Sequence, residues 1–313
     1  MAGTLEASVI ICAHNPRLDY FRRVITALRD QTLSPTKWEL LLVDNACDAP
    51  LALTWDISWH PNARHIREDE LGISVARRRG MQEASADLLI FVDDDNVLER
   101  NYLLHAVSIR NDWPILGVWG SAATIPEFER QPSEYLAPIL PYLALRECSS
   151  PRWSNVFPCV SATPWGAGMC LTRNVAGAYR EYNDSSSIQM TSRKGKKNLM
   201  CGEDLEICYV ACRLGAGMGI FPQLKLTHLI PKERVSKEYL LKLYEGTRAS
   251  IMLLIYKRTG IVPQFPLRPW GLLGALKHLV TKRGIHRHMY LANVRATFTA
   301  RRVIKNGQAR GDA

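Results

Sequence analysis

The first hundred residues contain three short apolar runs that alternate with amphipathic segments. The runs cover residues 8–13, 38–44 and 87–93, and their length and β-branched content predict buried strands. The 3.6-residue periodicity over 18–29 and 73–85 predicts helices between them. Strands that alternate with helices form a parallel sheet with right-handed crossovers. The fold class is therefore α/β, with a Rossmann-like, mostly parallel central sheet flanked by helices.

Three consecutive carboxylates, Asp93, Asp94 and Asp95, end the third run. In open parallel sheets ligands bind outside the carboxyl ends of the strands, where this triplet falls. Adjacent like charges destabilise a site unless a cation neutralises them. Carboxylate oxygens select Mg²⁺ or Mn²⁺, which usually bridge to substrate phosphates. The triplet predicts a divalent metal and a substrate that carries phosphate.

Two other interpretations of the triplet are open. One or two of the aspartates could cap the next helix, although capping does not account for three. Asp93, Asp95 and Val97 also resemble the DxDx[TV] signature of haloacid-dehalogenase-type phosphohydrolases, in which Asp93 would be the covalent nucleophile. That family carries its signature on the first strand, whereas two predicted strands precede it here. We therefore favour the metal and diphosphate interpretation.

Further motifs follow in a fixed order along the chain. They are the strand and loop at 9–15, Leu-Val-Asp44-Asn-Ala, the Gly72 to Gly80 segment with Arg77, the triplet, Trp165-Gly-Ala-Gly-Met169, Cys201-Gly202-Glu203-Asp204, and Thr227-His228-Leu-Ile-Pro231. Over about residues 8–235 this order and spacing resemble glycosyltransferase family 2, inverting enzymes with the nucleotide-diphospho-sugar transferase (GT-A) fold. Order and spacing together are more specific than any single motif.

The resemblance implies a donor side. Its predicted donor-binding residues are Ala13, Asn15, Asp44, Arg77, Asp93 and Asp94. In the family the aspartate at Asp44 hydrogen-bonds the uracil ring, and the arginine at Arg77 faces the nucleotide. Arg78 stands where asparagine is usual, which is a departure from the family pattern. The first aspartate of the triplet touches the ribose and donor sugar, and the last, Asp95, binds the metal.

The resemblance also implies an acceptor side and a catalytic pair. Trp165, Gly166 and Gly168 resemble the acceptor loop. Asp204, next to Glu203, is in the position of the catalytic base, and His228 is in the position of a residue that completes the metal shell with Asp95. Taken singly, each has a structural explanation: acids favour a helix start, glycines favour turns, and a histidine is often structural.

These motifs combine into one reaction. An acceptor hydroxyl must lose a proton as it attacks the anomeric carbon, and the departing nucleoside diphosphate must be neutralised. We expect an inverting, metal-dependent hexosyltransferase-type enzyme that uses a UDP-sugar and an acceptor hydroxyl in glycan, polysaccharide or glycolipid synthesis. A catalytically silent binding protein is the third alternative. The sugar, the acceptor, the linkage and the oligomeric state do not follow from the sequence.

The charge of the chain is concentrated at one end. From residue 263 onward ten Lys or Arg face one acid, so this segment carries +9 of the total +10. We expect a GT-A domain over 1–235, with a donor half over about 1–100 and a proline-punctuated, loop-rich acceptor half over about 101–235. A basic helical extension over 236–313 is expected to follow.

Two uses of the basic extension stay open: binding to an anionic membrane surface through 263–313, and packing on the body with a solvated basic face. Nucleic acid is not an expected partner, because no nucleic-acid-binding signature is present. Eight scattered cysteines without a CxxC pair fit a reduced compartment, and no apolar run approaches the ~20 residues of a membrane span. We expect a cytoplasmic protein, with peripheral attachment to the inner face of the membrane left open.

Overall fold

The computed structural model describes residues 4–186, 188, 199–200, 202–264 and 283–311. The chain divides into two compact units. The first takes its described residues from 1–127, 144–182 and 203–229, and the second from 128–143, 183–202 and 230–313. The predicted boundary at residue 235, between the transferase domain and the basic extension, is a functional boundary and stays a prediction. The expectations for residue 201 and for the 265–282 part of the basic extension concern residues outside the described ranges.

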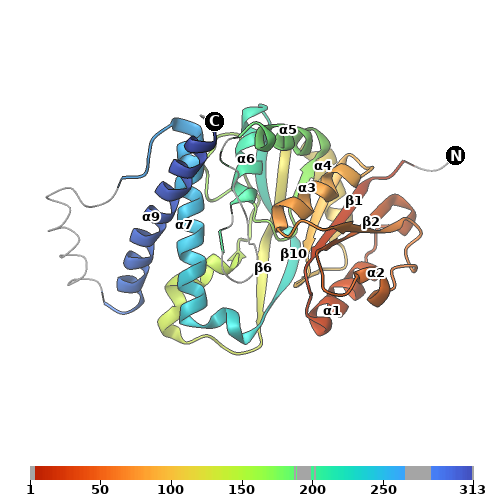
Figure 1. The fold of residues 1–313 in the computed structure, drawn as a ribbon. Coiled ribbons are helices and arrows are strands. Elements are labelled where there is room, and N and C mark those ends of the chain that lie inside the picture. The colour runs from red at the N-terminus through yellow and green to blue at the C-terminus, as the bar shows by residue number, and fades with distance from the viewer. Residues whose placement is uncertain (1–3, 187, 189–198, 201, 265–282, 312–313) are drawn as a thin grey trace, which may run out of the picture. The chain divides into compact units, whose positions relative to one another are not determined.

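Four parallel strands form one half of the sheet in the first unit (Figure 1). In spatial order they are β3 (Ala63–Glu68), β2 (Trp38–Asn45), β1 (Ala7–Ala13) and β4 (Leu88–Asp93). Their register sets Ala13 beside Asp44 and Cys12 beside Asp93. The carboxyl ends of these strands therefore meet at one edge, and the predicted α/β fold class is confirmed.

Antiparallel pairings extend the sheet beyond β4. The remaining strands are β9 (Cys170–Thr172), β6 (Leu116–Phe128), β10 (Gly217–Ile230), β5 (Asn96–Leu98), β7 (Arg146–Glu147) and β8 (Arg152–Ser154). The expectation of a loop-rich acceptor half missed the two long strands β6 and β10. Each strand contains two glycines and a proline, and β6 also contains two alanines. Such residues weaken the strand signal although most of each strand is buried.

Helices cover both faces of the sheet in the first unit. One apolar core lies beneath α1 (Leu18–Arg29) and α4 (Tyr102–Asp112), and a second lies beneath α3 (Ile73–Glu83), α5 (Arg173–Asp184) and α6 (Glu203–Arg213). The short elements are α2 (Leu51–Thr54) and the 3₁₀ turn η1 (Pro35–Lys37). The predicted strands and helices agree with the structure to within one or two residues at each end.

Two long helices dominate the second unit, α7 (Lys237–Thr259) and α9 (Ile285–Gly311). The 3₁₀ turns η2 (Glu134–Leu143) and η4 (Lys232–Val235) belong to the same unit. Ser236 caps the start of α7 by accepting the N–H of Tyr239, and Gly260 ends it with a φ of 69°. No described helix is long and apolar enough to cross a membrane.

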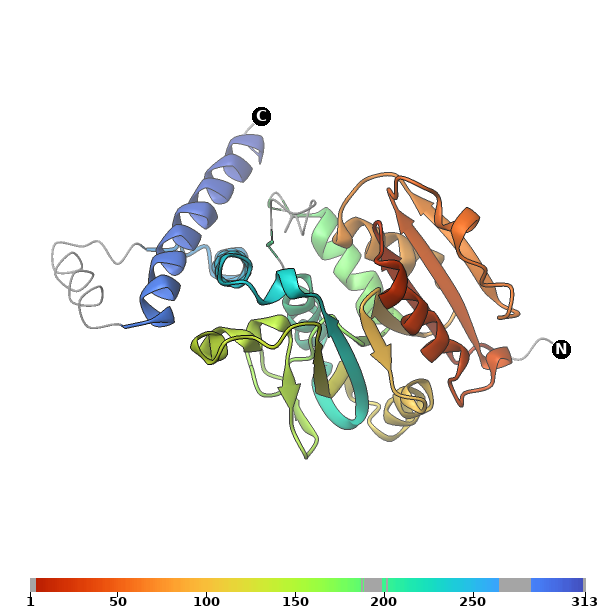
Figure 2. The ribbon, with the colours of Figure 1, turned by 90° about the horizontal axis from the view of Figure 1, so that it is seen from below.

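The helices α7 and α9 lie side by side and run in the same direction (Figure 1), and Figure 2 shows α9 beside α7 seen end-on. Contacts join Lys237 to His288 at one end and Tyr256 to Gln308 at the other. Leu253 of α7 forms an apolar cluster with Ala300 and Ile304 of α9. Burial of this seam holds the pair together.

The packing of α3 on β1 depends on Gly80. A Cβ at this position would overlap Cγ2 of Ile10, and Ile10 is fully buried with a stiff branched side chain.

We expect Gly80→Ala to lower the free energy of unfolding by about 1–3 kcal/mol, because it overpacks the core. Urea denaturation measures this change. Gly177→Ala in α5 is the matched control, because nothing lies within 4 Å of its Cβ. The Gly177→Ala change should raise the free energy of unfolding by about 0.5–1 kcal/mol. A stable Gly80 variant would contradict this close packing.

Candidate active site

The buried guanidinium of Arg77 joins three segments of the first unit. Its Nη2 donates to Oδ1 of Asp93 at 2.9 Å, and its Nη1 lies 3.7 Å from Oε2 of Glu203. Arg77 comes from α3, Asp93 from the end of β4 and Glu203 from the first residue of α6. Burial opposes the charge of Arg77, yet Asp93 and Glu203 raise its pKa above the ordinary value. Arg77 therefore stays a cation held between two acids.

Glu203 and Asp204 are two carboxylates whose pKa values are raised. Burial raises the pKa of Glu203 from 4.5 to about 7, against the opposing effects of Arg77 and the Ser74 hydroxyl. Burial also raises the pKa of Asp204, while Arg77 and the N–H groups of Leu205 and Gly166 oppose the rise. A carboxylate with a raised pKa holds a proton more tightly than one in water. Either residue is thus a better proton acceptor than an exposed acid.

The Gly166 to Gly168 loop comes close to this cluster because it lacks side chains. A Cβ on Gly166 would lie 2.9 Å from Nη1 of Arg77. Gly168 has a φ of 70°, and a Cβ there would overlap the Tyr102 hydroxyl. That hydroxyl donates to the carbonyl of Gly168 at 2.6 Å. The two glycines are therefore required by geometry in this loop, which Tyr102 holds in place.

Trp165 precedes this loop, and Arg146 orients it. The Arg146 guanidinium lies over the Trp165 ring at 4.6 Å from its centroid, a cation–π arrangement. The same guanidinium donates to the carbonyl of Thr163 at 2.7 Å. Burial lowers the pKa of Arg146. Arg146 thereby fixes both the ring and the backbone before it.

Asp95 and His228 meet although 133 positions separate them in the chain. Strand β5 directly follows the triplet and pairs with β10, in a register that sets Asn96 opposite His228. The N–H of Leu229 donates to the carbonyl of Asp95 at 2.9 Å. As a result Nε2 of His228 lies 3.6 Å from Oδ2 of Asp95. Asp94 lies between Asp93 and Asp95 and is half-buried.

The chemistry of the Asp95 and His228 pair fits a divalent metal. A carboxylate and an imidazole are both ligands of Mn²⁺-type ions, and the two facing atoms are close enough for one ion to contact both. The buried Oδ1 of neighbouring Asn96 has no hydrogen-bond partner among the described residues. Within the described ranges no group of three or more His, Cys, Asp and Glu forms a complete site. Remaining ligands would come from water and substrate oxygens, as such ions commonly require.

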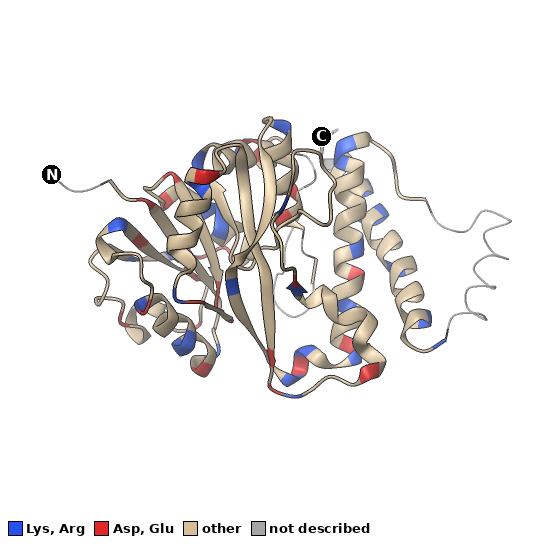
Figure 3. Cartoon of the chain, turned by 180° about the vertical axis from the view of Figure 1, so that it is seen from behind, with Lys and Arg blue, Asp and Glu red and all other residues tan. Residues whose placement is uncertain are grey.

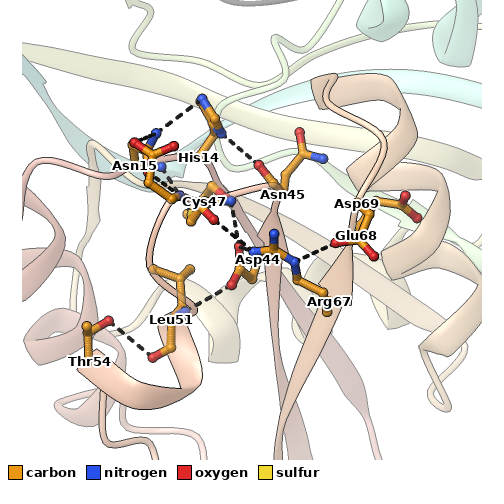
Figure 4. Close-up of polar contacts among 12 residues, drawn as sticks. His14, Asn15, Asp44, Asn45, Cys47, Leu51, Thr54, Arg67, Glu68 and Asp69 are labelled. Atoms are coloured by element: carbon orange, nitrogen blue, oxygen red, sulfur yellow. Dashed lines mark hydrogen bonds and ion pairs between the residues drawn. The ribbon is translucent and has the colours of Figure 1, made fainter.

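A network of hydrogen bonds fixes Asp44 at the carboxyl end of β2 (Figure 4). Its carboxylate accepts the N–H groups of Cys47 and Leu51 at 3.0 and 2.9 Å, and Nη1 of Arg67 at 2.8 Å. Burial raises the pKa of Asp44, but these donors outweigh burial and the net pKa is lowered. Asp44 is therefore an oriented anion.

The loop after β1 lies beside Asp44 and contains Asn15 (Figure 4). The Asn15 backbone has a φ of 46°, and its side-chain oxygen accepts the N–H of Asp48 at 2.9 Å. The carbonyl of Ala13 accepts the Cys47 thiol. The structure thus brings Ala13, Asn15 and Asp44 together, and it brings Arg77, Asp93, Glu203, Asp204 and Gly166 into a second cluster.

Three comparisons place this architecture among known proteins. Residues 8–146 match the model of Glycosyl transferase family 2. No curated protein sequence matches the chain. Among solved structures, residues 1–349 of S. aureus TarS have 12% identity and a TM-score of 0.51, with 96% of this chain and 91% of that one covered. The UDP complex of the same TarS fragment has a TM-score of 0.50, at 12% identity and the same coverage. GalNAc-T7 with UDP, GalNAc and Mn²⁺ has 15% identity and a TM-score of 0.53, with 82% of this chain and 52% of that one covered.

The fold is that of the GT-A solved structures, and the family match over residues 8–146 supports a glycosyltransferase. The resemblance to glycosyltransferase family 2 is confirmed by the family match over residues 8–146. The phosphohydrolase alternative is not favoured. Asp93, which would be its nucleophile, forms an ion pair with buried Arg77.

The pKa of Glu203 makes the stability of the fold depend on pH. Because the folded-state pKa is raised, the stability that neutral Glu203 contributes is complete below pH 4.5 and is lost as pH rises to about 7. Between these pH values we expect the free energy of unfolding of Glu203→Gln to rise by roughly 3 kcal/mol relative to that of the wild type. Urea denaturation at a series of pH values measures this difference. Glu99→Gln, at an exposed position, controls for the loss of a carboxylate. A difference between Glu203→Gln and wild type that stays constant with pH would contradict the raised pKa.

Proposed function

We propose that the protein transfers a sugar with inversion from a UDP-sugar to an acceptor hydroxyl. The observation that carries the proposal is the convergence of oppositely charged groups at the carboxyl edge of the parallel strands. Arg77 and Asp93 lie in one cluster with Glu203, and the sheet register holds Asp95 beside His228. Ligands of open α/β sheets bind at this edge.

The donor nucleotide is proposed to bind along Ala13, Asn15 and Asp44. Asp44 is an oriented anion with three donors already fixed, and a carboxylate can accept about four hydrogen bonds. One more donor, such as the ring N–H of uracil, completes it. Asp93 and Asp94 then face the ribose and the donor sugar, while Arg77 is proposed to support Asp93 on this side.

Asp95 and His228 are proposed to hold Mg²⁺ or Mn²⁺. The bound metal would supply positive charge to the diphosphate leaving group. GalNAc-T7 was crystallised with UDP and Mn²⁺, and this fold-level likeness supports the choice of metal and nucleotide. The carboxylate and imidazole atoms 3.6 Å apart support it independently.

Asp204 is proposed to accept the acceptor's proton. As the acceptor oxygen forms its bond to the anomeric carbon, the bond from that carbon to the diphosphate oxygen breaks and its electron pair leaves with the diphosphate. Attack from the face opposite the leaving group inverts the anomeric centre. The raised pKa of Asp204 suits this role, and Glu203 supports it by holding Arg77. Trp165, Gly166 and Gly168 are proposed to contact the acceptor.

The acceptor class proposed is a hydroxyl of a glycan, polysaccharide or glycolipid. We further propose that residues 1–235 perform the transfer and that 236–313 serve as a basic helical extension of a cytoplasmic enzyme. The close approach of Gly166 to Arg77 supports placing the acceptor loop beside the base.

The donor site can be tested by calorimetric titration of UDP and GDP with and without Mn²⁺. We expect Mn²⁺ to tighten UDP binding at least about tenfold, and Asp95→Ala to lose this increment, which corresponds to about 1.4 kcal/mol. Asp87→Ala is the matched control, since Asp87 lies at the other end of β4 and its side chain is 67% exposed. No nucleotide binding by the wild type, or Mn²⁺ dependence that survives in Asp95→Ala, would overturn the assignment.

The base can be tested by measuring UDP release from a UDP-sugar that the wild type turns over. Asp204→Asn keeps the shape of the side chain but removes the proton acceptor, so kcat should fall by about 10²–10⁴-fold. UDP affinity should stay within about twofold, because Asp204 is not among the proposed nucleotide contacts. Asp112→Asn, at an exposed position on α4, is the control. Near-normal turnover by Asp204→Asn would refute its role as base.

A further inference from the structure

The outward face of α9 carries cationic and apolar side chains at helical spacing. Successive members lie three or four positions apart and are exposed: Arg287, Leu291, Arg295, Phe298, Arg302 and Lys305. We call these six residues the α9 face. Leu291 is 37% exposed and Phe298 is 55% exposed. Steps of three and four place all six on one side of a helix.

The opposite side of α9 is already used for packing. Ala292, Ala296 and Ala300 are fully buried, and Ile304 is buried in the cluster with Leu253 of α7. The α9 face is therefore the side that the helix pair leaves exposed. Substitutions on it can be made without removing the buried seam.

The charge of the α9 face is largely uncompensated. Residues 285–311 contain six Lys or Arg and no acid, and Figure 3 shows α9 with blue segments only. Arg295 pairs with Glu245 of α7 at 2.7 Å. Arg287, Arg302 and Lys305 form no ion pair with any residue in the described part of the chain. A surface with this field attracts anions.

We propose that the α9 face binds the surface of an anionic lipid bilayer. The cations contact phosphate headgroups, while Leu291 and Phe298 enter the boundary between headgroups and acyl chains. Helices that lie in a membrane interface combine a basic face with large apolar side chains in this way, and each cation near an anionic leaflet adds about 1 kcal/mol, or about fivefold in affinity. A nucleic-acid backbone would use the cations but would leave Leu291 without an apolar environment. The proposal does not depend on the glycosyltransferase function.

The test is sedimentation of the full chain with vesicles, either phosphatidylcholine alone or equal parts of phosphatidylcholine and phosphatidylglycerol. Wild-type protein should bind the anionic vesicles and lose binding as salt increases. The triple variant Arg287→Gln, Arg302→Gln, Lys305→Gln should bind about a hundredfold more weakly. The double variant Leu291→Ser, Phe298→Ser should bind at least about tenfold more weakly, because two apolar side chains no longer leave water.

The matched control removes three exposed cations of the first unit, with Arg22→Gln, Arg100→Gln and Lys225→Gln, and should bind as the wild type does. UDP titration and thermal unfolding of each variant separate loss of lipid binding from loss of fold or of donor binding. If one α9 variant does not fold, the other carries the test. Equal weakening by the control, equal binding to neutral vesicles, or no wild-type binding would overturn the proposal. A different outcome would assign the α9 face to nucleic acid: both α9 variants still bind the vesicles, and the triple variant no longer binds a single-stranded RNA probe.

Discussion

The first unit depends on one buried cation. Transfer of a guanidinium from water into a protein interior costs several kcal/mol unless acids compensate it. Arg77 meets this requirement chiefly through the Asp93 carboxylate at 2.9 Å, and Glu203 lies 3.7 Å away on the other side. The three residues come from α3, β4 and α6, so the ion pairs connect a helix, a strand end and a second helix start. Gly166 must also be small, because a side chain there would displace the same guanidinium.

The contact between Asp95 and His228 depends in turn on the backbone register of β5 against β10. His228 faces Asp95 because three residues of β5 pair with β10 directly after the aspartate triplet. A slip of one residue in this ladder would turn the His228 side chain to the other face of the sheet. The proposed metal pair thus rests on hydrogen bonds between β5 and β10 as much as on the two side chains. Tyr102 plays a similar supporting part for the Gly168 loop.

The sequence predicted the fold class, three of the four parallel strands and the helices α1 and α3, because buried runs and amphipathic periodicity are local signals. It did not predict β3, in which charged and polar residues surround Ile66 as the single buried side chain. Four supporting side chains were likewise missed. Tyr102 and Arg146 have no neighbours along the chain that mark them, and Arg67 and Ser74 gain their roles only when strand ends and helix starts meet. Their partners are distant in sequence, so one sequence contains no local signal for them.

Charge balance at Arg77 explains why two adjacent carboxylates can have different roles. Asp93, Glu203 and Asp204 share a single buried cation, and three ionised acids would leave a net negative charge in a poorly solvated place. With a pKa of about 7, Glu203 is the acid that can hold a proton near neutral pH. A neutral Glu203 leaves the charge of Arg77 to Asp93 and Asp204. Asp204 is then free to ionise, as the proposed proton acceptor must be before the acceptor hydroxyl arrives.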